Sequence, residues 1–263
     1  LTPQEVDAGS NDACTLESLA LDVTAFDCDD IGANTVTLTA EDVNNNISTC
    51  EATVTVLDTI PPQALCQDVT VQLDVSGMGT LSPNEVDAGS NDACGISGLS
   101  IDTNDFDCAD TGNNPVVLTV EDANGNSTVC TATVTVTDTV APEMACQDAT
   151  VLLDADGLGS LDIADIDAGT SDACGLDTLF LSQTDFDCAD VGLLGLTLAA
   201  EDMNGNSNTC TASVTVEDNI APTVTCGDTV LILDNDGLGT LNLSDVNGSF
   251  SDACGIRSAG LDK

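Results

Sequence analysis

The side chains in this sequence that could do chemistry are almost all carboxylates and thiols. Its 263 residues include 46 Asp or Glu and 13 Cys, against two Lys or Arg and no His, Tyr or Trp. Carboxylate pairs can hydrolyse glycosidic bonds, but here they recur in every copy of a repeat, as scaffold features do and a single active site does not. The sequence therefore predicts no catalytic residue and no enzyme. Metal binding and disulfide formation are the chemistry that remains.

One acidic loop has the oxygen spacing of an EF-hand calcium site. Counted from Asp154, oxygens fall at the ligand positions of such a loop, with Gly159 at the position of its sharp turn. Leu158 departs from the pattern, and the corresponding loop of the preceding repeat matches it less well. A plain acidic β-turn explains the loop equally well. The candidate ligands are Asp154, Asp156, Asp162 and Asp165, with Ser160 offering a backbone oxygen.

A second acidic group combines a hairpin tip, a preceding loop and a linker. In a β-sandwich these segments lie at the end where the preceding domain attaches, so about six or seven oxygens could converge there, as many as calcium takes. Calcium would also offset charge that the protein cannot neutralise itself. Local turn caps are the alternative, and the Asn-Gly turn is structural in either case. The candidate ligands are Asp58, Asp87, Asp92, Glu121, Asp122, Asn124 and Asn126, and, in the next repeat, Asp138, Asp167, Asp172, Glu201, Asp202, Asn204 and Asn206.

The whole sequence repeats with one fixed period. The stretch Asn114–Pro142 recurs at Asn34–Pro62 and Leu194–Pro222, since 114 − 34 = 80 and 194 − 114 = 80. Self-similarity at a fixed period indicates a tandem array. The cysteines form four columns with the same offset: Cys14, Cys94, Cys174 and Cys254; Cys28, Cys108 and Cys188; Cys50, Cys130 and Cys210; Cys66, Cys146 and Cys226.

Within the repeated stretch, apolar and polar residues alternate as in strands with one buried face. The two alternating runs are separated by Asn124-Gly125, a step that favours a tight reversal, so this part of the repeat is predicted to be a β-hairpin. About seven short strands per repeat, without a helical period, are typical of a Greek-key sandwich. The predicted fold is all-β, a tandem array of immunoglobulin-like Greek-key β-sandwich domains.

The period divides the chain into two complete and two partial domains. Residues 61–140 and 141–220 are complete, residues 1–60 lack the opening strands, and residues 221–263 stop after the third strand. Two arrangements would complete the partial domains.

Either the sequence is a window on a longer continuous array, or the C-terminal strands of one copy complete the N-terminal domain of the next. In the second arrangement Cys226 would face Cys50, as in β-strand addition. Residues 241–263 duplicate strands that the first domain already has, which favours the window. Both arrangements give a head-to-tail filament of copies.

Cysteine content and charge indicate an extracellular protein. Four cysteines per period at fixed spacing are typical of two disulfides per domain and of an oxidising compartment. Buried thiols or a zinc site are alternatives, although the close Cys pairs usual in zinc sites are absent. The formal net charge is −44, and the two basic residues, Arg257 and Lys263, lie near the C-terminus. Such a chain repels nucleic acid and anionic membranes, and no apolar run is long enough to predict a membrane span. Export on a leader outside this sequence is expected.

The order of motifs resembles a known family. Pro-x-x-x-Cys precedes an alternating strand, then Asp-x-Cys-Gly, then Val-x-Leu-x-x-Glu-Asp-x-Asn-Gly-Asn-Ser-x-x-Cys-x-Ala-x-Val-x-Val. This order resembles the hyalin-repeat (HYR) family of immunoglobulin-like modules, and in particular its acidic tandem versions in long surface proteins of gliding, Bacteroidota-type bacteria. The resemblance covers the whole chain, and the hairpin is its most specific part. It implies an extracellular extender or adhesive role without catalysis.

The resemblance also implies a disulfide pattern, in which the opening-strand cysteine pairs with the last-strand cysteine. That would give Cys66–Cys130 and Cys146–Cys210. The remaining columns would then pair as Cys94–Cys108, Cys174–Cys188 and Cys14–Cys28. Spacing alone does not exclude Cys66–Cys94 with Cys108–Cys130.

Short motifs also mark candidate glycosylation sites. Four asparagines lie in Asn-x-Ser/Thr sequons, and four threonines follow Asp and precede an aliphatic residue, which resembles the O-glycosylation context of Bacteroidota. The residues are Asn46, Asn126, Asn242 and Asn247, and Thr59, Thr139, Thr178 and Thr229.

Together these patterns predict a non-enzymatic, extracellular, disulfide-stapled and calcium-rigidified array that serves as a structural fibre or cell-surface extender. Its predicted partners are copies of itself. The alternative is an adhesin that recognises a glycan or another cell. Near-identical repeats without Trp or Tyr offer no platform for a sugar ring and no distinctive hot spot, which argues against the alternative.

Overall fold

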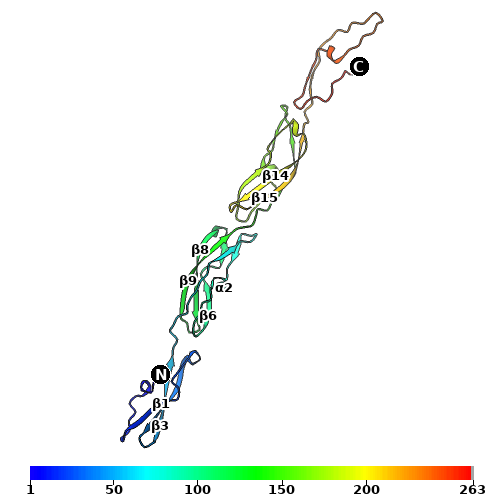
Figure 1. Cartoon of the computed structure of the whole chain (residues 1–263). Coiled ribbons are helices and arrows are strands. Elements are labelled where there is room, and N and C mark those ends of the chain that lie inside the picture. Colours follow the sequence, from blue (N-terminus) through cyan, green and yellow to red (C-terminus); the bar gives the residue numbers. More distant parts are fainter. Residues whose placement is uncertain (262–263) are drawn as a thin grey trace. The chain divides into compact units, whose positions relative to one another are not determined.

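The computed structural model describes residues 1–261 and consists of β-strands joined by turns and one-turn helices (Figure 1). The chain forms two compact units, one from Leu1–Val71 with Gly79–Thr137, the other from Gln72–Met78 with the chain from Asp138 onward. The same succession of elements returns at the offset that the sequence predicted. This confirms the predicted all-β tandem array of immunoglobulin-like sandwiches.

Each complete repeat contributes six strands and two one-turn helices. Residues 61–140 contain β4 (Val69–Gln72), β5 (Met78–Thr80), α2 (Pro83–Val86), β6 (Ile96–Ile101), β7 (Asp105–Asp107), η2 (Cys108–Asp110), β8 (Gly112–Asp122) and β9 (Ser127–Thr137). Residues 141–220 contain β10 (Ala149–Leu152), β11 (Leu158–Ser160), α3 (Ile163–Ile166), β12 (Leu176–Leu181), β13 (Asp185–Asp187), η3 (Cys188–Asp190), β14 (Gly192–Asp202) and β15 (Ser207–Glu217).

The strands of a complete repeat form a four-stranded and a two-stranded sheet. In the third repeat the orders are β10-β15-β14-β12 and β11-β13, and the second repeat has β4-β9-β8-β6 and β5-β7. The opening strand β10 runs parallel to the last strand β15, with Ala149 opposite Val214, whereas β15, β14 and β12 pair antiparallel. The opening strand therefore closes the sheet against the end of its own repeat.

The core lies on one face of the long hairpin, as the alternation predicted. On β8, Val116, Leu118 and Val120 are fully buried, and on β9 Val134 and Val136 are at most 1% exposed. The Asn-Gly step turns the chain between them, with Gly125 at a φ of 88° that glycine adopts readily. Apart from one phenylalanine per repeat, the core is aliphatic.

The one-turn helices were not predicted. In α2 a proline occupies the first turn, and the Ser82 amide donates to the Glu85 carboxylate at 2.8 Å, which closes the turn around the buried Val86. A single turn is too short to show a 3.6-residue period, so the sequence carried only this capping signal.

The opening-strand disulfides are confirmed, and the others differ from the expected pairing. Cys66–Cys130 and Cys146–Cys210 join the segment just before the first strand to the last strand of the same repeat. Cys28 bonds Cys94 and Cys188 bonds Cys254, so these disulfides link one repeat to the next. The predicted pairs Cys14–Cys28, Cys94–Cys108 and Cys174–Cys188 are therefore wrong, and Cys14 is an exposed thiol. Cys28 and Cys188 therefore bond the Asp-x-Cys loop of the next repeat instead of the one in their own repeat.

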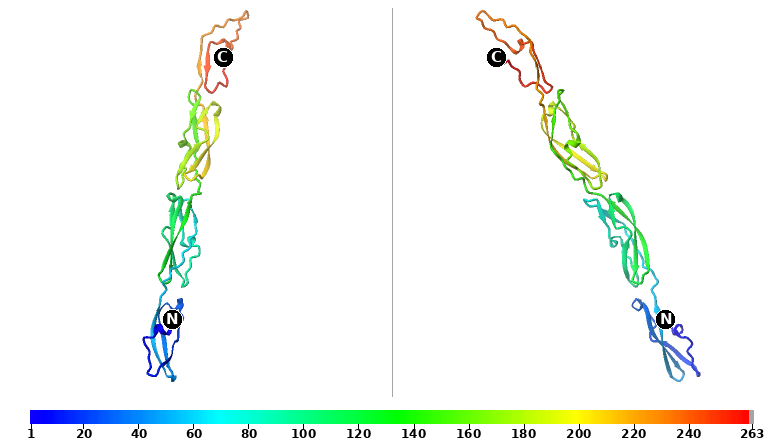
Figure 2. Two further views of the ribbon diagram at one scale, coloured as in Figure 1. Left: turned by 60° about the vertical axis from the view of Figure 1, so that its left-hand side comes forward. Right: turned by 180° about the vertical axis from the view of Figure 1, so that it is seen from behind.

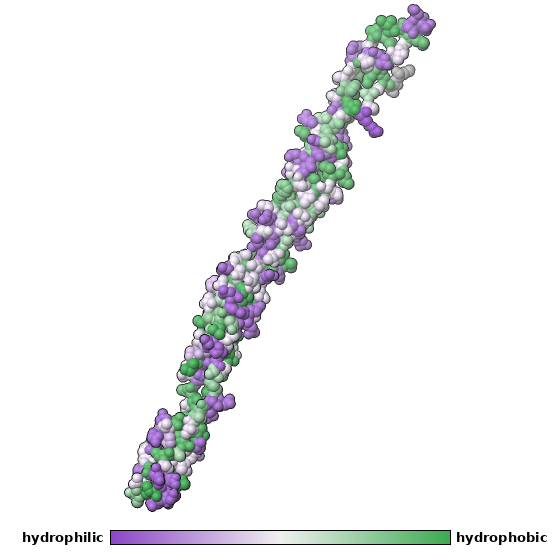
Figure 3. All heavy atoms as spheres, viewed as in Figure 1, coloured by the Kyte–Doolittle hydropathy of each residue, from purple (hydrophilic) through white to green (hydrophobic). Residues whose placement is uncertain are grey.

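The partial repeats have open sheets (Figure 2). Residues 1–60 form α1 (Pro3–Val6), β1 (Leu16–Leu21), η1 (Cys28–Asp30), β2 (Gly32–Asp42) and β3 (Ile47–Val56), with the sheet order β1-β2-β3. Residues 221–261 contain β16 (Thr223–Thr225), η4 (Leu243–Asp245) and β17 (Ser249–Ser251). Apolar side chains are exposed over this C-terminal segment, the part nearest the label C in Figure 1 (Figure 3). Among the described helices, none is long and apolar enough to cross a membrane.

We expect Leu198→Ala to destabilise the third repeat by about 2–5 kcal/mol, the range found when a buried leucine leaves a cavity. Leu198 is fully buried on β14, whereas Leu193 of the same strand is 73% exposed. Urea unfolding of Leu198→Ala and the control Leu193→Ala would test this. Equal losses in the two variants would contradict the assigned core face.

Peptide mapping without reduction should recover Cys28 linked to Cys94 and Cys188 linked to Cys254. Recovery of Cys94 linked to Cys108 would restore the pairing within a repeat and refute the links between repeats.

Candidate cation site

Two aspartates from separate segments come together at two equivalent places. The carboxylates of Asp58 and Asp92 and the sulfur of Cys94 lie within 4.8 Å of one another. Asp138, Asp172 and Cys174 form the equivalent group one repeat later. Each group therefore joins the linker that precedes a complete repeat to the Asp-x-Cys loop of that repeat.

Local turns hold these aspartates in place. Asp58 follows the end of β3, and its Oδ1 accepts a hydrogen bond from the Ile60 amide at 3.0 Å. Asp92 Oδ1 accepts from the Cys94 amide at 2.7 Å. From the hairpin tip, Asn126 Nδ2 donates to the Asp58 carbonyl oxygen at 3.3 Å. Linker, loop and tip thus meet, as the sequence predicted for sandwich loops at one end.

One oxygen in each group has no partner. Oδ2 of Asp58 and Oδ2 of Asp138 are buried and accept no hydrogen bond. Asp138 as a whole is 8% exposed, so little water reaches it. Burying an unpartnered carboxylate oxygen is costly, and a second carboxylate close to it adds repulsion. The arrangement therefore calls for a positive charge that the described side chains nearby do not supply.

The donor set suits a hard divalent cation. Carboxylate and carbonyl oxygens are the ligands that calcium prefers, whereas zinc favours nitrogen and thiolate sulfur. Cys94 is bonded to Cys28, so its sulfur is not a thiolate and contributes little as a ligand. The protein oxygens available are those of Asp58 and Asp92, and, in the next group, those of Asp138 and Asp172.

Asp122, the aspartate at the hairpin tip, stabilises the hairpin turn and is not part of the Asp58–Asp92 group. Asp122 is 1% exposed, and its Oδ1 accepts from the Asn124 and Asn126 amides at 2.8 Å each. Its Oδ2 accepts from Asn126 Nδ2 at 2.7 Å, so both oxygens have partners. Burial alone would raise the pKa of Asp122, but the hydrogen bonds from Asn126 and Asn124 outweigh it and lower that pKa below its ordinary value. The same balance lowers the pKa of Asp202.

The EF-hand-like loop divides into two local motifs. Asp154 Oδ1 accepts from the Asp156 and Leu158 amides and caps the turn between β10 and β11. Asp165 Oδ2 accepts from the Asp162 amide and closes α3. Among the described residues these four carboxylates are not gathered into one metal-binding group. The structure here favours the acidic β-turn, the alternative interpretation.

The remaining predicted ligands lie outside the two groups. Asp87 Oδ1 accepts from the Ser90 amide and Asp167 Oδ1 from the Thr170 amide, and hydrogen bonds from Ser90 and Thr170 lower the pKa of these aspartates. Glu121 and Glu201 are exposed at the ends of β8 and β14. The predicted sets thus shrink to the linker and loop aspartates, with Asn126 and Asn206 as supports.

Sequence reasoning missed the disulfide beside each aspartate pair. Cys94 lies two residues after Asp92, and its bond to Cys28 crosses from one repeat to the next. The signal available in the sequence was the Asp-x-Cys order, which places a half-cystine and a carboxylate on one loop. The period offers each of these cysteines two possible partners, and spacing does not choose between them.

The candidate glycosylation sites differ in accessibility. Asn126 is half-buried, and its side-chain nitrogen donates to Asp122 and to Asp58, so it is not free to carry a glycan. The nitrogen of Asn46 also donates to a carboxylate, that of Asp42. The other candidates, Asn242, Asn247, Thr59, Thr139, Thr178 and Thr229, lie in exposed positions.

Comparison with known proteins gives remote structural neighbours alone. No protein-family model matches the chain. No curated protein matches it either. Protocadherin Gamma B7 extracellular cadherin domains 1–4 are 14% identical, covering 86% of this chain and 68% of that one, with a TM-score of 0.33.

Two further solved structures have similar values. Mouse Cadherin-23 EC22–24 is 13% identical over 81% of this chain and 89% of that one, with a TM-score of 0.31. Titin domains I67–I69, in an E-to-A variant, are 14% identical over 70% and 75%, also with a TM-score of 0.31. The assignment of the fold rests on the sheet topology described above.

The capped aspartates predict a loss of stability in acid. Because the folded-state pKa of Asp122 and Asp202 is lowered, their contribution is fully present above the ordinary aspartate pKa of about 3.9 and is lost as the pH falls through the folded-state value. We expect Asp122→Asn to lower the unfolding free energy at pH 7. The difference from the unchanged chain should shrink as the pH falls below about 4, because the aspartate of the unfolded chain takes up its proton there while the folded-state aspartate is still charged. Denaturant titrations in calcium-free buffer would measure it, and a difference that is constant with pH would contradict the charged cap.

Proposed function

We propose that the chain is a non-enzymatic extracellular spacer whose linkers are fixed by bound calcium. The immunoglobulin-like fold and the disulfides fit an extracellular structural or adhesion-type module. The proposal goes further, to a load-bearing extender of the hyalin-repeat kind, because the repeats differ little and carry few features that distinguish one from another.

The observation that carries the proposal is that Asp138, whose buried Oδ2 has no hydrogen-bond partner, lies close to Asp172. A protein of formal charge −44 with two basic residues has no cation of its own to place there. A divalent cation would satisfy both carboxylates at once. The same chemistry recurs at Asp58 and Asp92, which makes it a property of the repeat and not of one position.

Calcium at these groups would stiffen the linker. Asp58 belongs to the connecting segment and Asp92 to a loop of the following repeat, so an ion between them ties the connection to the sandwich. The Cys28–Cys94 bond holds the same loop covalently. Without the ion the two carboxylates repel each other, and the linker is no longer tied to the loop through Asp58.

The alternative role, an adhesin, has less support. The exposed aromatic residues among those described are isolated phenylalanines, such as Phe180 at 65% exposure. Sugar-binding surfaces commonly use Trp or Tyr as a stacking platform, and the sequence has neither. A structural role therefore accounts for more of these observations than sugar binding does.

Calcium titration calorimetry tests the proposal. We expect two ions per chain with dissociation constants of roughly 10⁻⁴–10⁻³ M, the range of extracellular modules. Asp138→Asn should weaken one site by about tenfold or more, because the charge of the ligand set governs affinity. The control Asp177→Asn removes the same charge from an exposed position on β12.

A thermal measurement provides a second readout. Calcium at about 10 mM should stabilise the folded chain by roughly 1.4–2.7 kcal/mol per site, from the ratio of free ligand to dissociation constant. The Asp138→Asn chain should lose the calcium-dependent stabilisation that comes from one of the two sites, and the Asp177→Asn chain should keep the stabilisation from both. Identical titrations of Asp138→Asn and the unchanged chain would refute the site.

A further inference from the structure

The linker that leads into the third repeat, residues 138–142, is attached to the last hairpin of that repeat at successive points. Asn206 Nδ2 donates to the carbonyl oxygen of Asp138 at 3.2 Å, and Asn208 Nδ2 donates to the carbonyl oxygen of Pro142 at 2.9 Å. Cys210 follows with the disulfide described above. Residues 206, 208 and 210 alternate along the chain, so their side chains leave the same side of the strand. The incoming chain is therefore fastened stepwise along the start of β15.

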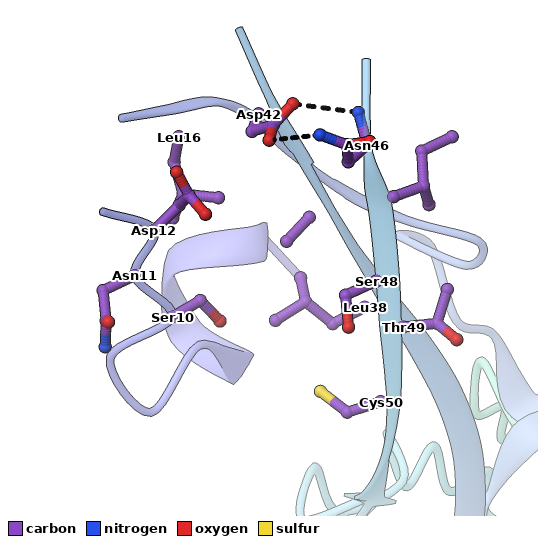
Figure 4. Close-up of a pocket in the computed structure, with 12 residues that line it drawn as sticks. Ser10, Asn11, Asp12, Leu16, Leu38, Asp42, Asn46, Ser48, Thr49 and Cys50 are labelled. Carbon is purple, nitrogen blue, oxygen red and sulfur yellow. Dashed lines mark hydrogen bonds between the residues drawn. The ribbon is translucent and has the colours of Figure 1, made fainter. Parts of the chain in front are cut away.

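A buried carboxylate holds the first of these contacts in place. Asp202 is 2% exposed, and it accepts from the Asn206 amide and from Asn206 Nδ2 at 2.8 Å each. Figure 4 shows the same cap in the first repeat, where Asn46 donates twice to Asp42. The second hydrogen on Nδ2 of Asn206 is left to bind the Asp138 carbonyl oxygen. This cap recurs in all three hairpins, so it does not distinguish one repeat from another.

The chain just after the linker is tied to the loop that carries the second aspartate. The Glu143 amide donates to the Ser171 carbonyl oxygen at 2.8 Å, and the Ser171 amide donates back to the Glu143 carbonyl oxygen at 3.0 Å. Ser171 directly precedes Asp172, a member of the candidate cation group. Asn208 holds Pro142, the residue immediately before Glu143. The approach of the two carboxylates thus depends on a linker that is held at both of its ends.

The second repeat lacks one of these attachments. Asn126 donates to the Asp58 carbonyl oxygen at 3.3 Å, as its counterpart does in the third repeat. The residue equivalent to Asn208 is Thr128, since 208 − 80 = 128, and threonine has no amide nitrogen to donate. Asp58 is half-buried, whereas Asp138 is 8% exposed. The linker with fewer attachments therefore carries the more exposed aspartate.

The second linker is stiffened in a different way. Pro61 stands where the third linker has Ala141. Proline fixes one backbone angle of its own residue, but it attaches the linker to no neighbouring element. Asn208, in contrast, fastens its linker to the hairpin that also carries Asn206.

We propose that Asn208 is a positioning residue of the cation site formed by Asp138 and Asp172, and that it makes this site the tighter of the two. The inference rests on the calcium binding proposed above. A linker that the hairpin already holds spends more of its time with the two carboxylates close together. The apparent affinity of a site rises with the fraction of molecules in the binding-competent arrangement, so less of the binding free energy goes into ordering the linker.

One hydrogen bond sets the size of the effect. The net contribution of a neutral bond between an amide and a carbonyl corresponds to about two- to tenfold in an equilibrium constant. We therefore expect the calcium dissociation constants of the two sites to differ by about two- to tenfold, with the lower value at Asp138.

Two chains with one working site each allow the comparison. Asp58→Asn leaves the third-repeat site intact, and Asp138→Asn leaves the second-repeat site intact. Calorimetric calcium titration of the full chain with either change should give the lower dissociation constant for Asp58→Asn. Equal constants would overturn the proposal.

Exchanging the two residues tests the cause. Asn208→Thr in the Asp58→Asn chain should raise the dissociation constant about two- to tenfold, and in the Asp138→Asn chain it should change nothing. Thr128→Asn in the Asp138→Asn chain should lower the constant, because by the period the new amide reaches the Pro62 carbonyl oxygen. The control Thr128→Ala should leave it unchanged. A gain of affinity cannot come from a damaged fold, so the absence of a gain with Thr128→Asn, or of a loss with Asn208→Thr, would refute the role of this position.

A measurement without calcium follows the linker itself. The Val140 amide donates to Asp138 Oδ1 at 3.0 Å within the linker. Asn208→Thr should speed hydrogen exchange in a peptide that covers residues 138–142 by about two- to tenfold and leave exchange in β14 unchanged. Unchanged exchange in the linker would contradict the positioning role. Equal acceleration in β14 would show a general loss of stability and would contradict it too.

Calcium binding by the unchanged chain distinguishes this inference from the proposed function. If the unchanged chain binds no calcium, both fail. If it binds two ions with equal affinity, the proposed function stands and the positioning role of Asn208 fails.

Discussion

The packing of the opening strand against the last strand is the interaction on which the structure depends. A repeat this small buries little apolar area, and its core has one phenylalanine and otherwise small aliphatic side chains. Ala132, Val134 and Val136 are fully covered when β4 lies beside β9. Cys66–Cys130 holds the two strands together and limits the freedom of the unfolded chain. Where the opening strand is absent, in residues 1–60, the corresponding face is half open.

A second constraint is the lack of basic side chains. Arg257 and Lys263 are the two basic residues, and both lie in the partial C-terminal repeat. Carboxylates in the complete repeats must therefore be satisfied by backbone and amide N–H groups, as Asp122, Asp154 and Glu85 are. Among the described residues, Asp138 and its counterpart Asp58 in the preceding linker differ, since one oxygen of each is buried without a donor. That difference, and not acidity in general, singles out the candidate cation site.

Much of the fold could be predicted from alternation and the repeat, because each strand of the hairpin has one buried face. Of the predicted metal ligands, the structure brings two pairs of aspartates together, Asp58 with Asp92 and Asp138 with Asp172. The sequence marks which residues carry oxygen, but turn geometry decides which oxygens are already occupied, as at Asp122 and Asp202. The links between repeats were missed because Cys28 stands much nearer in sequence to Cys14 than to Cys94. In the chain-entropy model the longer loop costs about 1.4 kcal/mol more to close, so the shorter one was the simpler expectation.

The links between repeats change how the chain can carry tension. Cys28–Cys94 bridges in one bond a sequence separation of 66, and Cys188–Cys254 does the same. Cys66–Cys130 and Cys146–Cys210 each bridge a separation of 64 in the same way. Unfolding a sandwich under load would then release little extra length, because the disulfides bypass most of it.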